Sequence, residues 1–131
     1  MDKIYEQLEK TIQMASASRH PENTIKLSLQ MIDESLPKEN NMLYRKRSVN
    51  LLQCCILFIA KGKEYEKERG KNTGALIWLL TRNDLAEILQ KAMEKSPHDK
   101  KLLEKNYLLW SSHPDREQIR RSLILRLGLA D

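Results

Sequence analysis

The chain has 131 residues, of which 40% are hydrophobic and 31% charged, and this length supports one hydrophobic core and excludes two large domains. Four glycines and four prolines are too few for the turns of a β-sandwich or barrel, and the hydrophobic content excludes a disordered chain. The net charge of +5 is spread thinly along the chain, which excludes a single dedicated phosphate-binding run. We therefore predict one all-α domain over residues 1–131, with six or seven helices and no sheet.

Two amphipathic helices are predicted before residue 40. His20-Pro21-Glu22 is typical of the start of the second, because proline suits the first helical position and acidic residues suit the first turn. Apolar residues recur at three- and four-residue spacing in two stripes, which are Ile4, Leu8, Ile12 and Ala15, then Ile25, Leu29, Ile32 and Leu36.

A long helix is predicted over residues 40–60, and its second half is apolar on nearly every side, as expected of the centre of the fold. It holds adjacent Cys54 and Cys55, which cannot form an unstrained disulfide with each other. Reduced thiols and an N-terminus without the apolar segment of a signal peptide predict a cytoplasmic protein. The ten-residue apolar run is half a membrane span, so no membrane partner is expected.

Residues 62–74 hold three of the four glycines and no apolar stripe. They form either a frayed extension of the long helix or an exposed, mobile loop. Tyr65 stands alone among charged residues there, so we expect it to be exposed and a candidate partner contact.

The last part of the chain predicts a short apolar helix over residues 75–80 and three further helices. Thr81-x-x-Asp84 and Ser112-x-x-Asp115 resemble capping boxes, and His113-Pro114-Asp115 is typical of a helix start. Two stripes follow these signals, which are Leu85, Ile88, Leu89, Ala92 and Met93, then Ile119, Leu123 and Leu127.

A weak internal similarity appears when Pro37 is aligned with Pro97. The two segments read Ile25-x3-Leu29-x2-Ile32-x4-Pro37 and Leu85-x3-Leu89-x2-Ala92-x4-Pro97. This order resembles the second helix and closing proline of a tetratricopeptide repeat, although the family has a small residue where Ile25 and Leu85 stand. The resemblance implies antiparallel helical hairpins in a short stack with a protein-binding groove, and a generic helical bundle is the alternative.

No catalytic or metal-binding motif is found, so we predict a protein that is not an enzyme and needs no cofactor. Each of the three histidines is adjacent to a proline in a predicted turn, and none has a second histidine or cysteine at metal-binding spacing. Both cysteines lie in the most apolar stretch, which is unsuited to a reactive thiolate.

The leading functional hypothesis is a protein-interaction, adaptor or regulatory domain that binds another protein or peptide through helical surfaces. Its predicted contacts lie on two helices, with Asn41, Tyr44, Arg45 and Ser48 on one and Lys101, Lys105 and Leu108 on the other. Tyr65 is a further predicted contact. The alternative is a nucleic-acid-binding regulator using a diffuse basic surface made of Lys100, Lys101, Lys105, Arg116, Arg120 and Arg121. Self-association through the C-terminal helix is a further hypothesis, based on Leu125, Leu127 and Leu129.

Overall fold

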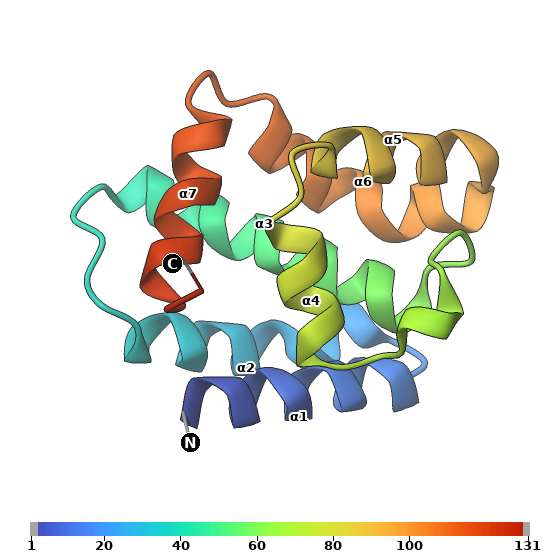
Figure 1. Cartoon of the computed structure of the whole chain (residues 1–131), viewed down its shortest axis with the longest axis horizontal. Helices are drawn as coiled ribbons and strands as arrows, with labels where there is room; N and C mark the ends of the chain where they lie inside the picture. Colours follow the sequence, from blue (N-terminus) through green and yellow to red (C-terminus); the bar gives the residue numbers. More distant parts are fainter. Residues whose placement is uncertain (1–2, 130–131) are drawn as a thin grey trace.

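The computed structural model describes residues 3–129, so residues 1–2 and 130–131 of the predicted domain lie outside the described part. The described residues form one all-helical domain with seven α-helices and no strand, which confirms the predicted fold class (Figure 1). The helices are α1 (Lys3–Ala17), α2 (Pro21–Ser35), α3 (Met42–Lys61), α4 (Thr73–Leu80), α5 (Leu85–Lys95), α6 (Pro97–Ser111) and α7 (Arg116–Arg126), with a 3-10 turn η1 (Lys67–Arg69) before α4.

Helix α3 is the centre of the fold. Residues 51–60 are all buried, and α3 packs against α1, α2, α4, α6 and α7. In Figure 1 the α1–α2 hairpin lies below α3, the α5–α6 hairpin lies above it, and α4 and α7 cross its near side. A helix that is apolar all round needs such cover on every side, so the sequence pattern explains its central position.

The amphipathic stripes predicted from the sequence form the inner faces of the surrounding helices. Leu8, Ile25, Leu89 and Ile119, one from each stripe, have no exposed surface. The hydrophobic effect favours this arrangement, because each fully buried leucine or isoleucine contributes about 1.5–3 kcal/mol relative to an exposed one. None of the helices in the described part of the chain combines the length and apolar character needed to cross a membrane.

Several helices begin at prolines or capping residues, and two helix starts differ from those that the sequence predicts. Pro21 and Pro97 begin α2 and α6, and the Asn41 side chain caps α3 by accepting the Leu43 and Tyr44 amide hydrogens at 3.0 and 3.1 Å. The Thr81 capping box is wrong, because the Thr81 hydroxyl donates back to the Ile77 carbonyl at the end of α4.

The final helix also starts later than predicted, since α7 begins at Arg116 and the Asp115 side chain makes no capping hydrogen bond. Residues 112–115 instead form a turn, in which the His113 amide donates to the Trp110 carbonyl at 3.2 Å and the Arg116 amide donates to the His113 carbonyl at 3.1 Å. The Trp110 indole nitrogen donates to the Arg116 carbonyl at 2.9 Å, which ties the start of α7 to the end of α6.

Residues 62–72 form a loop with one 3-10 turn rather than an extension of α3. The fully buried carboxylate of Asp99 on α6 accepts the backbone amides of Lys63 and Glu64 at 2.7 and 2.9 Å. Two charge-assisted hydrogen bonds of this kind fix the path of the chain as it leaves α3. Of the two predicted alternatives, the structure therefore shows the loop, which is exposed at most of its residues and tied at its start to α6.

Candidate partner-binding groove

Helices α3 and α6 lie side by side and antiparallel, as the predicted pair of binding helices requires. Three contacts along their length define this pairing. The Asn50 side chain donates to that of Asn106 at 3.1 Å, the Cys54 thiol lies 3.9 Å from the Leu103 carbonyl, and His98 Nε2 lies 3.0 Å from the Lys61 carbonyl.

Helix α2 forms a second wall beside this pair. The Gln53 amide on α3 donates to the Glu22 carbonyl at 3.4 Å, and the Lys105 ammonium on α6 lies 3.6 Å from the Glu22 carboxylate. Gln53 is 6% exposed whereas the Lys105 side chain is 77% exposed, so α3 is recessed between its neighbours. We call this surface the α2–α3–α6 groove.

Two open hollows lie at the ends of α2, and both are bounded by α3. The first has a volume of about 560 Å³ and is lined by Gln30, Asp33, Glu34, Met42, Arg45, Lys46, Arg47, Val49 and Asn50. The second has a volume of about 480 Å³ and is lined by Ser18, Arg19, His20, Pro21, Glu22, Asn23, Lys61, His98, Lys101 and Leu102. The first is lined by α2 and α3 alone and the second also by α6, and we treat them as the two ends of the α2–α3–α6 groove.

Cations outnumber carboxylates in both hollows. The first hollow has three cations and two carboxylates, and the second has three cations and one carboxylate, in addition to two histidines. No carboxylate in the described part of the chain lies within 4.0 Å of a side-chain nitrogen of Lys46, Lys61 or Lys101. The groove thus presents positive charge that the fold itself does not use.

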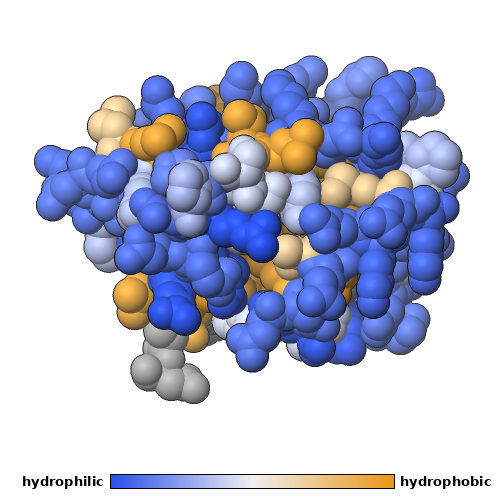
Figure 2. Space-filling model, turned by 90° about the horizontal axis from the view of Figure 1, so that it is seen from above, coloured by the Kyte–Doolittle hydropathy of each residue, from blue (hydrophilic) through white to orange (hydrophobic). Residues whose placement is uncertain are grey.

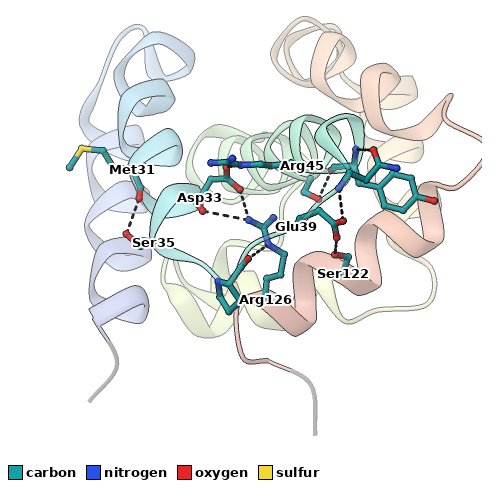
Figure 3. Close-up of polar contacts among 11 residues, drawn as sticks. Met31, Asp33, Ser35, Glu39, Arg45, Ser122 and Arg126 are labelled. Carbon is teal, nitrogen blue, oxygen red and sulfur yellow. Dashed lines mark hydrogen bonds and ion pairs between the residues drawn. The ribbon is translucent and has the colours of Figure 1, made fainter.

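A buried ion cluster holds the first hollow in shape (Figure 3). Arg45 of α3 and Arg126 of α7 approach the Asp33 carboxylate from two sides, and Arg126 Nη2 lies 2.9 Å from Asp33 Oδ1. Arg126 Nε also donates to the Pro37 carbonyl at 2.8 Å, which joins α7 to the segment between α2 and α3. The hydrogen bond and charge of Asp33 raise the pKa of Arg45.

Glu39 extends the same cluster. Its carboxylate accepts the Asn41 amide at 3.0 Å and the Ser122 hydroxyl at 2.7 Å, and these hydrogen bonds lower the pKa of Glu39. The segment before α3 is therefore fixed by contacts to both α3 and α7.

The predicted contacts on α6 keep their exposure, whereas those on α3 are mostly occupied. Lys101 lines the second hollow, Lys105 lies between the hollows, and Leu108 is 51% exposed. Arg45 lines the first hollow but pairs with Asp33, and Asn41 caps α3.

Ser48 and Tyr44 are used inside the fold. Ser48 has no exposed surface and its hydroxyl donates to the Tyr44 carbonyl at 2.7 Å, which corrects its placement on a binding surface. The Tyr44 hydroxyl lies 2.6 Å from Asp115 Oδ2 and its ring packs edge-on against His113, which ties α3 to the α6–α7 turn. The hydrogen bond to Asp115 raises the pKa of Tyr44.

The expected exposure of Tyr65 is wrong. Tyr65 is 4% exposed, its ring packs edge-on against Phe58, and its hydroxyl donates to the Gly70 carbonyl at 2.6 Å. Gly70 has φ 85°, a conformation that glycine adopts without strain, so the loop can turn back toward the tyrosine. Tyr65 closes the loop and does not offer a contact to a partner.

The six cations of the nucleic-acid hypothesis do not form one surface. Arg120 is 7% exposed, donates to the Leu80 carbonyl at 2.7 Å and pairs with Glu117, which corrects its placement among surface contacts. Lys100 pairs with Glu104 at 3.7 Å. Arg116 and Arg121 belong to α7, which packs against α3, whereas Lys101 and Lys105 lie on α6.

The C-terminal leucines also differ from one another. Leu125 is 66% exposed, but Leu127 is 2% exposed and belongs to the core, which corrects its use as a self-association contact. Leu129 is half-buried against the core. One exposed leucine is a smaller apolar surface than the sequence indicated.

Apolar side chains are scattered over the face that carries α5 and α6. Figure 2 shows this face as mostly hydrophilic, with apolar side chains in small separate groups.

The sequence did not identify most of the cations that line the two hollows. Lys61 ends α3 and Lys101 lies in α6, and only tertiary packing brings them to the same hollow. Arg19 and His20 sit in the turn between α1 and α2 for the same reason. The one local signal is the run Arg45-Lys46-Arg47, in which the sequence predicted a contact only at Arg45.

No protein-family profile, curated protein or solved structure matches the chain. The resemblance to tetratricopeptide repeats therefore stays a prediction.

Proposed function

We propose that this chain is a non-enzymatic interaction domain that binds a segment of a partner protein in the α2–α3–α6 groove. The observation that carries the proposal is the groove itself, an open surface at whose ends lysines without carboxylate partners among the described residues lie beside apolar side chains. Surfaces that combine exposed apolar side chains with unpaired charge are typical of binding sites rather than of inert solvent-facing helices.

The state of the cysteines supports a role without covalent chemistry. Cys54 and Cys55 are both fully buried, and burial raises the pKa of each thiol well above its ordinary value. A thiol in that state is a poor nucleophile. Two free, adjacent thiols in the core also support the proposal of a reducing, cytoplasmic location.

Site-specific photo-crosslinking tests the proposal. A photoreactive phenylalanine analogue replaces Gln30 or Lys101 in the groove, or Lys91 on α5 as a matched control, and the proteins are irradiated in cells of the source organism. All three positions are exposed, so each variant should fold. We expect a discrete protein adduct from Gln30 and Lys101 and none from Lys91.

Two other adducts would overturn the proposal. A nuclease-sensitive adduct from the groove positions would favour the nucleic-acid alternative. An adduct of twice the chain mass would indicate a second copy of this chain. The same pattern of adducts from all three positions, or no adduct from the groove, would also contradict the proposed role.

A further inference from the structure

The chemistry of the groove indicates which kind of partner segment it fits. We infer that the α2–α3–α6 groove binds an acidic amphipathic segment of a partner protein, with carboxylates on the groove lysines and apolar side chains in the two hollows. This inference rests on the proposed function and adds the chemical class of the ligand.

Each hollow has a cationic part and an apolar part. In the first, Lys46 lies near Met42 and Val49, and Met42 is 62% exposed. In the second, Lys61 and Lys101 lie near Leu102. Bound carboxylates would gain the attraction of these lysines, while apolar side chains would cover the methionine and the leucine.

The spacing of the hollows suits a short segment. Both hollows touch α3, the first between Met42 and Asn50 and the second at Lys61. At 1.5 Å per helical residue these positions lie about 16–28 Å apart. An extended chain of about five to nine residues, or a helix of about eleven to nineteen, spans that distance.

The ion pair between Lys105 and Glu22, which lies between the hollows, can be replaced by an ion pair between Lys105 and a ligand. Lys105 and Glu22 lie 3.6 Å apart with side chains 77% and 42% exposed, and such exposed pairs contribute little to stability. A carboxylate of the bound segment can therefore take the place of Glu22 beside Lys105 at little cost. The central part of the groove then adds a third contact to the segment.

A nucleic acid fits this groove less well. No aromatic side chain other than the two histidines of the second hollow lines either hollow among the described residues, so bases lack the usual stacking platform. Glu22 and Glu34 stand among the cations and would repel a backbone that carries a charge at every residue. A peptide, in contrast, can carry carboxylates at the positions that face the lysines and none at the positions that face Glu22 and Glu34.

Fluorescence anisotropy with defined probes tests the inference. The probe is a fluorescein-labelled peptide of about twelve residues made of glutamate, aspartate and leucine, sized to the spacing of the hollows. A lysine–leucine peptide and a single-stranded oligothymidylate of the same length are the comparison probes. All are measured against the full chain at low and at moderate salt.

Two pairs of charge reversals with the same net charge make the test specific. Lys46→Glu with Lys101→Glu places one reversal in each hollow, at side chains that make no hydrogen bond or ion pair within the described residues. Lys91→Glu with Arg121→Glu is the control pair on α5 and α7. Circular dichroism and thermal unfolding verify that both variants fold.

We expect the acidic peptide to bind and the groove pair to weaken binding by about tenfold or more, with less than about twofold change for the control pair. No binding of the acidic peptide, equal loss in both pairs, or tighter binding of the oligothymidylate overturns the inference. If photo-crosslinking gives protein adducts from the groove but the groove charge reversals do not weaken peptide binding, the acidic character of the ligand is wrong and the proposed function stands. If photo-crosslinking gives no protein adduct from the groove, the proposed function itself is wrong.

Discussion

Asp99 shows how one buried side chain fixes a loop that has no apolar stripe. It sits in the first turn of α6, where Ser96 Oγ accepts its amide hydrogen at 3.2 Å, and its carboxylate holds the residues that follow α3. Acidic residues in the first turn also interact favourably with the helix dipole. The second hollow includes Lys61 and His98 from these same segments, so Asp99 also supports the groove.

We predict that Asp99→Ala destabilises the fold by about 2–4 kcal/mol, because the backbone amides of Lys63 and Glu64 lose their buried acceptor. Urea denaturation followed by circular dichroism measures this change. Asp99→Asn is the control, since its amide oxygen can still accept one of the two hydrogen bonds, and it should lose less. Equal stability of the alanine variant and the parent would show that the loop does not depend on this carboxylate.

Both cysteines should be inert in the folded protein. Burial raises the pKa of each thiol, and both side chains are inaccessible to solvent. We predict that Ellman's reagent reacts with neither thiol at pH 8 in the native state and with both in denaturant. Stoichiometric, fast reaction of the native protein would contradict the packing of α3.

Contacts between elements depend on polar groups at the edge of the core. Glu9 on α1 joins the start of α4, where its carboxylate accepts the Thr73 amide at 2.8 Å and the Thr73 hydroxyl at 2.9 Å. The hydrogen bond from the Thr73 amide is the main cause of the lowered pKa of Glu9.

This contact predicts a pH dependence of stability. A carboxyl with a lowered pKa in the folded state contributes stability that is present above its ordinary value of 4.5 and is lost as the pH falls through the folded value. We predict that Glu9→Gln reduces the loss of stability below about pH 4.5, measured as the thermal midpoint across an acid pH series. An unchanged acid profile would show that Glu9 does not contribute.

The Asp33 cluster joins three elements and gives a sharper test of packing between them. Arg126 is 8% exposed and is held by Asp33 and the Pro37 carbonyl. Removing Arg126 leaves the Asp33 carboxylate with Arg45 alone and takes the donor away from the Pro37 carbonyl, so we predict that Arg126→Met costs about 2–3 kcal/mol. The double variant Asp33→Asn with Arg126→Met should lose less than the sum of the single changes, as measured by urea denaturation. Strict additivity would contradict direct coupling.

At the scale of the whole molecule, the spacing of apolar residues in the sequence predicted the buried faces of the helices and the central position of α3. The stripes containing Leu8, Ile25 and Leu89 are buried as expected, and α3 is the central helix, because helical spacing places such residues on one face. The loop over residues 62–72 was one of two predicted alternatives.

The remaining features depend on residues far apart in the sequence. Arg126 meets Asp33 across 93 positions and Arg120 meets the Leu80 carbonyl across 40, so local pattern assigns both arginines to the surface. Tyr65 was misplaced because its neighbours in sequence are charged, whereas its ring packs on Phe58. The groove lies beyond local pattern for the same reason, since α2, α3 and α6 together create it.

The proposed function and the acidic ligand both require that ligands bind in the α2–α3–α6 groove. Titration of the isotope-labelled chain with the acidic peptide, followed by amide chemical shifts, tests this claim directly. We predict that the shift changes concentrate around Gln30, Lys46, Lys61 and Lys101, with little change at α4 and the exposed face of α7. Shift changes centred on α7, or none at saturating peptide, would contradict it.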